Sequence, residues 1–188
     1  MSFAGDLHEE DLGIFLGMAS QFNDQEEKNR KKDIEGAQSD LSLSDRERHE
    51  YVMHIEDIYD RIGSAVDIAH SMAIVALHSR IEVARNKILQ RTFPDLVAYE
   101  MHKIKYLKKH VYPSLPSARE TLEVQELRLT ANAIKHRDGK VSPKLGNISG
   151  LVIDSHLVNL DKTYKRLLPG VKSYMDGLVK GAVVELGN

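Results

Sequence analysis

Residues 64–91, SAVDIAHSMAIVALHSRIEVARNKILQR, indicate the fold class because apolar side chains recur in them every three or four residues. This spacing predicts a helix with one apolar stripe directed at a core. Ser64 is a suitable N-cap for that helix. The stripe consists of Ala65, Ile68, Ala69, Met72, Val75, Ala76, Val83 and Ile88.

Further helices are predicted on both sides of this segment. Upstream, Ser44 and Glu47 fit a capping box, which predicts a helix from there to Gly63. Downstream, Thr92-Phe93-Pro94 ends the central helix, because the residue before a proline avoids helical angles. Pro94 is then expected to open a helix that runs to about His110.

The C-terminal half is also predicted to be helical. Ser117 and Glu120 fit a second capping box, and the helix that follows is expected to end at Asp138-Gly139. Residues 140–150 are predicted to form a loop, and residues 151–153 a short extended piece.

The last predicted helix lies within residues 160–186 and is expected to be kinked or split at Pro169-Gly170. Because no sustained alternation of strand type occurs, the fold class is predicted to be all-α, an up-and-down bundle of four to six helices. The bundle is assigned to residues 41–188. Residues 1–40 are predicted to be a polar, short helical extension, in which residues 21–40 form a surface linker or a frayed helix.

Composition limits the classes of function. The chain has no cysteine, which excludes disulfides, a thiolate nucleophile and a zinc knuckle. The start MSFAGDLHEEDLG lacks the pattern of a secretory signal, and no run of about 20 apolar residues stands out as a membrane span. We therefore expect a soluble cytoplasmic protein without a membrane partner.

Charge is distributed unevenly along the chain. Residues 1–50 carry 13 acidic and 6 basic residues, whereas residues 80–144 carry 14 basic and 7 acidic residues. A polyanion such as RNA is therefore a candidate partner of the second segment. The alternative is that its lysines and arginines lie on ordinary solvated faces.

Arg128, Asn132 and His136 recur every fourth residue and are the candidate catalytic residues. A histidine transfers protons near neutral pH, and an arginine binds phosphate. His136 would be the general acid or base, Arg128 would stabilise charge on the phosphate, and Asn132 would orient the imidazole. The alternative is that these residues have a structural role. Arg128 would then pair with an acid such as Glu123 or Glu126, or with an acid on another helix. Asn132 and His136 would cap or bridge loops.

The stretch LRLTANAIKHRDG, with Arg128 and His136 on one late helix, resembles the HEPN superfamily of small helical bundles. The resemblance implies a homodimer that acts as a metal-independent endoribonuclease in a bacterial toxin or antiphage defence system, with a cognate antitoxin or defence protein as partner. Seven residues separate Arg128 from His136, which places them about 12 Å apart along the helix axis. A twofold dimer would bring the arginine of one subunit to the histidine of the other.

Basic residues near these positions are the candidate RNA contacts. They are Lys103, Lys105, Lys108, Lys109, Lys135 and Arg137. Tyrosines between the lysines of residues 99–110 are typical of surfaces that bind single strands. No cofactor or metal is expected, because the spacing of His78 and Glu82 alone does not make a metal site. The alternative function is a non-catalytic helical interaction module that dimerises or docks a partner protein.

Overall fold

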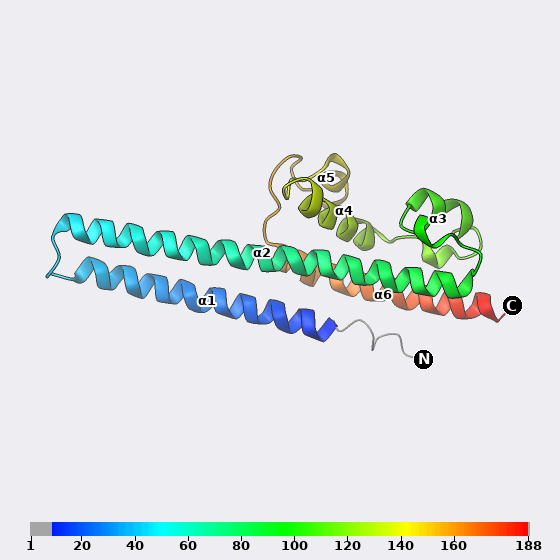
Figure 1. Ribbon diagram of the computed structural model, residues 1–188, viewed down its shortest axis with the longest axis horizontal. Helices are drawn as coiled ribbons and strands as arrows, with labels where there is room; N and C mark the ends of the chain where they lie inside the picture. Colours follow the sequence, from blue (N-terminus) through cyan, green and yellow to red (C-terminus); the bar gives the residue numbers. More distant parts are fainter. Residues whose placement is uncertain (1–8, 188) are drawn as a thin grey trace. The chain divides into compact units, whose positions relative to one another are not determined.

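The computed structural model describes residues 9–187, and within them it has six α-helices and no strand (Figure 1). The helices are α1 Glu9–Ser39, α2 Asp45–Thr92, α3 Ile104–His110, α4 Leu122–His136, α5 Pro143–Ser149 and α6 Leu160–Leu186, with 3₁₀ turns η2 Ala98–Glu100 and η3 Pro116–Ala118. The predicted all-α helical bundle is confirmed.

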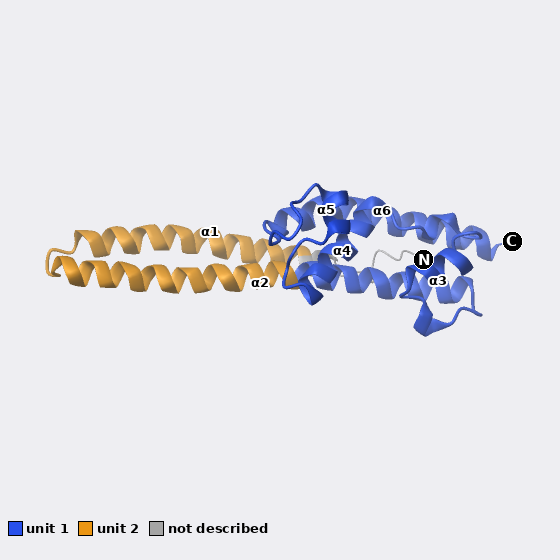
Figure 2. Ribbon diagram, turned by 90° about the horizontal axis from the view of Figure 1, so that it is seen from above, with its two compact units in different colours: residues 1–8, 73–188 blue, residues 9–72 orange. Residues whose placement is uncertain are grey.

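The described chain divides into two compact units that join inside α2 (Figure 2). Residues 9–72, called here the hairpin unit, comprise α1 and the first part of α2, which run antiparallel. Residues 73–187, called here the core unit, comprise the rest of α2 and all later elements. The predicted domain boundary at residues 40 and 41 falls at the turn between α1 and α2, inside the hairpin unit, whereas the two units divide at residues 72 and 73.

The hairpin unit corrects the prediction for residues 21–40, which are helical up to Ser39 instead of forming a linker. The segment is poor in apolar residues but rich in Glu, Lys, Gln and Arg, which are strong helix formers. It also packs on α2: the Tyr59 hydroxyl donates to Asp33 at 2.8 Å, and Ala37 and Ile55 are buried. Residues 1–8 of the predicted extension lie outside the described residues.

The start of α2 confirms the first capping box. The backbone N–H of Ser44 donates to Glu47 Oε2 at 2.8 Å, and the N–H of Glu47 donates to Ser44 Oγ at 3.3 Å. The predicted break at Gly63 is wrong, because α2 continues without interruption to Thr92. A glycine inside a helix costs only about 1 kcal/mol, which the neighbouring turns offset.

Replacing Gly63 with alanine is therefore expected to raise the free energy of unfolding by about 0.5–1 kcal/mol. A Cβ at this position meets no atom within 4 Å, so the substitution adds helix propensity without a clash. Urea denaturation followed by circular dichroism measures the change. Gly139→Ala is the control, and it is expected to lower the free energy of unfolding, because Gly139 has a φ of +69°, which strains a residue with a side chain. A destabilised Gly63→Ala variant would contradict the expectation.

The face of α2 that is buried is not the one predicted. Ile68, Met72 and Val83 of the predicted stripe are 61%, 64% and 53% exposed, although Ile88 is buried. The buried apolar residues of α2 are Ile55, Val66, Ala73, Ile74, Leu77, Ile81, Ile88 and Leu89. The helix is apolar on two sides, so periodicity alone does not select the side that meets a partner.

By length and composition, α2 is the one helix among residues 9–187 that is apolar enough to cross a membrane, and 22% of its apolar stretch is buried. One helix of this kind is weak evidence and assigns no membrane.

In the core unit, α4 packs against both α5 and α6, and η3 packs against α6. Thr121 caps α4 by accepting from the N–H of Val124, so the predicted box of Ser117 and Glu120 is wrong. The predicted stop after His136 is confirmed by the left-handed Gly139. The fully buried residues of this unit include Ile74, Leu77, Leu89, Leu107, Val111, Leu127, Val141, Leu145, Leu167, Val171 and Leu178.

Four further predictions for this unit are corrected. A turn and η2 follow Pro94, so α3 begins only at Ile104. Within the predicted loop of residues 140–150, Pro143–Ser149 form α5, with Ser142 as N-cap and a left-handed Gly150 as C-cap. Residues 151–153 form no strand. Of the two predicted alternatives for the last helix, the split at Pro169 is wrong, because α6 is continuous from Leu160 to Leu186.

Candidate functional site

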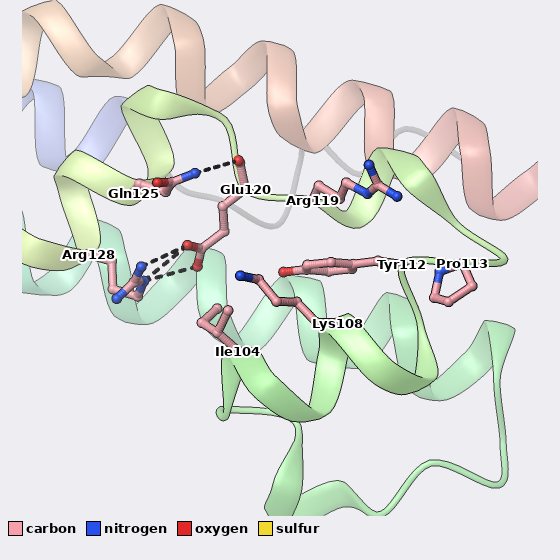
Figure 3. Close-up of a pocket in the computed structure, with 8 residues that line it drawn as sticks. All are labelled: Ile104, Lys108, Tyr112, Pro113, Arg119, Glu120, Gln125 and Arg128. Atoms are coloured by element: carbon pink, nitrogen blue, oxygen red, sulfur yellow. Dashed lines mark hydrogen bonds and ion pairs between the residues drawn. The ribbon is translucent and has the colours of Figure 1, made fainter. Parts of the chain in front are cut away.

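A cleft of about 590 Å³ in the core unit is the candidate functional site (Figure 3). Helix α3 and the turn after it form one side, and the segment before α4 together with α4 forms the other. The lining residues are Ile104, Lys108, Tyr112, Pro113, Arg119, Glu120, Gln125 and Arg128. The cleft therefore brings Lys108 of the predicted basic segment to Arg128 of the predicted catalytic stripe.

Glu120 joins two arginines in the floor of the cleft. Arg128 Nε lies 3.1 Å from both carboxylate oxygens, and Arg128 Nη2 lies 3.1 Å from Oε2. From α2, Arg85 Nη1 approaches Oε1 at 3.5 Å. Gln125 donates to the backbone carbonyl of Glu120 at 3.0 Å and holds the segment in place (Figure 3).

The burial of this trio differs from one member to the next. The side chains of Arg85 and Glu120 are each 5% exposed, whereas Arg128 is 28% exposed and faces the cleft. Glu82, which is 33% exposed, approaches Arg85 at 3.8 Å. Two guanidinium groups thus share one buried carboxylate, and the second acid stands at the edge. With Glu82 included, the two arginines and the two acids are balanced in charge, and Arg128 is the arginine that solvent reaches.

Two tyrosines adjoin this network as neutral groups. Burial raises the pKa of Tyr112, and the negative charge of Glu120 raises it further. Burial also raises the pKa of Tyr174, whose hydroxyl donates to the carbonyl of Ala118 at 3.1 Å. Both phenols therefore keep their protons at neutral pH. Figure 3 shows Tyr112 lying along the cleft beside Lys108.

The structure does not bring the three predicted catalytic residues together. Arg128 lines the cleft and is paired with Glu120, as the structural alternative describes, although its partner precedes α4 instead of lying within it. Asn132 is half-buried one turn further on, and His136 is exposed at the last residue of α4. Neither of these two lines the cleft.

The histidine near Arg128 is His78 of α2. It is 9% exposed, and its Nδ1 has no hydrogen-bond partner among the described residues. Burial lowers its pKa, Glu82 opposes this effect, and Lys135, Arg85 and Arg128 add to it. His78 is therefore a neutral imidazole at pH 7. Within residues 9–187, no three His, Asp or Glu side chains form a group that would hold a metal ion.

The predicted RNA contacts occupy different environments. Lys108 lines the cleft. Lys103 pairs with Glu100 at 2.8 Å, and Arg137 pairs with Asp154 at 3.1 Å. The side chains that remain, those of Lys105, Lys109 and Lys135, are exposed.

Sequence reasoning missed Arg85, Arg119 and the role of Glu120. For Arg85 there was a signal, since it follows Leu77 and Ile81 at steps of four residues on the buried face of α2. Comparison of the chain with protein-family models, with curated proteins and with solved structures gives no match.

Proposed function

We propose that the protein binds RNA, and that the cleft of the core unit contacts the phosphate groups. The observation that carries the proposal is the lining of the cleft. Lys108, Arg119 and Arg128 line it, and the acid among the lining residues, Glu120, is already neutralised by arginines. Cationic grooves that follow a phosphate backbone are the common feature of proteins that bind single strands.

The charge of the whole core unit supports this proposal. Residues 73–187 contain 19 basic and 11 acidic residues, a net charge of +8. Residues 9–72 contain 7 basic and 16 acidic residues, a net charge of −9. A polyanion is attracted to the core unit and repelled by the hairpin unit, so electrostatics select the surface that contains the cleft.

Cleavage is the second part of the proposal and comes from the HEPN resemblance. Arg128 would stabilise charge on the phosphate, and His136 would transfer the proton, without a metal. Because these residues do not share a cleft within one chain, this activity requires a homodimer. The proposed setting is a bacterial toxin or antiphage defence system, with an antitoxin or another defence protein as partner.

Incubation of the pure protein with labelled RNA in the presence of EDTA tests binding and cleavage together. RNA binding is expected to weaken steeply with salt, and Lys108→Ala is expected to lower the slope of log K against log salt by about 1. His136→Ala is expected to abolish any cleavage and to leave binding intact, because His136 is outside the cleft. Salt-independent binding, or no binding, would refute the proposal.

A non-catalytic interaction module is the second candidate function, and the outer surface of α1 favours it. Ile14, Phe15, Met18 and Phe22 are each 45–64% exposed. Phe15, Met18 and Phe22 follow the i, i+3, i+7 spacing and therefore lie along one side of α1. Such an apolar side typically packs against another protein surface. Light scattering of the protein alone tests for a homodimer, and Met18→Glu is expected to dissociate it.

A further inference from the structure

We propose that the cleft contains a site for a single phosphate group, with Arg128 and Lys108 as its charged donors. The phosphate belongs either to an RNA backbone, in which case the inference rests on the proposed function, or to a free phosphate ion. The site is more specific than a basic surface, because it is built on a buried ionic network.

The first argument is the position of Arg128 at the exposed edge of the network. Arg85 is 5% exposed and pairs with Glu120 at 3.5 Å and with Glu82 at 3.8 Å, so its charge is compensated inside the protein. Arg128 shares Glu120 with Arg85 and is 28% exposed at the cleft. It is therefore the arginine of the network that an anion in the cleft can reach.

The second argument is the set of donors that point into the space. The contacts of Arg128 with Glu120 use Nε and Nη2, so Nη1 is not part of the pair. Lys108 extends from α3 into the cleft, and the protonated hydroxyl of Tyr112 lies beside it (Figure 3). The guanidinium of Arg119 points away from Glu120 in this view, so we place it outside this site.

The chemistry of these donors favours phosphate. A guanidinium, an ammonium and a phenol that approach from different sides match the several oxygens of a tetrahedral anion. Glu120 already occupies the planar, fork-like contact that a carboxylate ligand would use on Arg128. The cleft volume of about 590 Å³ leaves ample room for the ion.

Titration calorimetry of the full chain with inorganic phosphate, at constant ionic strength in chloride buffer, tests the site. Lys108→Ala is expected to weaken phosphate binding by about tenfold, the loss of one charge-assisted hydrogen bond. Lys144→Ala removes an exposed lysine of α5 that is not part of the cleft and is expected to leave the affinity unchanged. Absence of phosphate binding, or equal weakening by both substitutions, would overturn the proposal.

A second measurement follows thermal unfolding with and without phosphate. In Glu120→Gln, phosphate is expected to raise the melting temperature more than in the unaltered chain, because Arg128 has then lost its carboxylate partner. In Glu126→Gln, whose buried carboxylate pairs with Arg166 away from the cleft, the shift is expected to match that of the unaltered chain. Equal shifts in all three proteins would count against the site.

Competition separates this inference from the proposed function. RNA that displaces phosphate supports both. Phosphate binding without any RNA binding supports the site and refutes RNA as its ligand. RNA binding that phosphate does not weaken at constant ionic strength refutes the site and leaves the proposed function standing.

Discussion

Glu120→Gln is expected to lower the free energy of unfolding of the core unit by about 3–5 kcal/mol, the usual cost of removing one partner from a buried ion pair. The amide leaves Arg85, at 5% exposure, without its buried counter-charge. It also breaks the two-oxygen contact with Arg128. Arg85 then keeps only the more distant carboxylate of Glu82, 3.8 Å away.

Glu126→Gln is the matched control for this substitution. Glu126 is 7% exposed and accepts from Arg166 Nη1 at 3.0 Å, so it resembles Glu120 in burial and in its partner type. Its arginine, however, is 57% exposed and regains water when the carboxylate is lost. We expect a loss of about 1 kcal/mol, because such a pair is screened by solvent.

Urea denaturation of both variants at pH 7 measures the loss in free energy of unfolding that each substitution causes. If the hairpin unit and the core unit unfold at different urea concentrations, each unit is followed by its own probe. Comparable losses in Glu120→Gln and Glu126→Gln would mean that the burial of the partner arginine does not control the cost.

The local signals in the sequence predicted part of the fold well. The box of Ser44 and Glu47 and the stop at Gly139 depend on neighbours within a few residues, and both are confirmed. Ser117 and Glu120 show the same pattern and fail, because the carboxylate of Glu120 is taken by arginines from two helices. A capping pattern in the sequence shows that the hydrogen bonds of a capping box can form. Whether they do form depends on partners that are distant in the sequence.

The choice of buried face on α2 shows the same limit. Ile68 and Ile74 are similarly apolar, yet the first is 61% exposed and the second is fully buried. Only the helices that pack against α2 distinguish them, and those contacts are long-range. For this reason the predicted apolar stripe has the spacing of a helix but lies on the wrong side of α2.

Only some residues of the candidate site were predictable from the sequence. Arg128 and Lys108 were selected from local charge and spacing, and both line the cleft. The partners that define their chemistry come from α2 and from the segment before α4, and no local pattern connects Arg85 with Glu120. His136 was selected because it follows Arg128 at helical spacing, but two turns of helix carry it beyond the cleft.

Gly170→Ala is expected to destabilise the core unit by about 1–3 kcal/mol, although alanine is the better helix former. A Cβ at this position would lie 2.9 Å from Cβ of Glu123 and closer still to its Cγ. Glu123 lies in the first turn of α4, so its Cβ moves only if the backbone of that turn moves. The glycine thus permits the close approach of α4 to α6.

Gly177→Ala, two turns further along the same helix, is the matched control. A Cβ there meets no atom within 4 Å, so we expect a gain of about 0.5–1 kcal/mol from helix propensity. The two substitutions are chemically identical and lie in one helix, so their opposite signs in urea denaturation isolate the contact with Glu123. If Gly170→Ala also stabilised the protein, α4 would not approach α6 at this point. The position of Glu120 and Arg128 beside the cleft would then have to be revised, because α4 and the segment before it hold both residues.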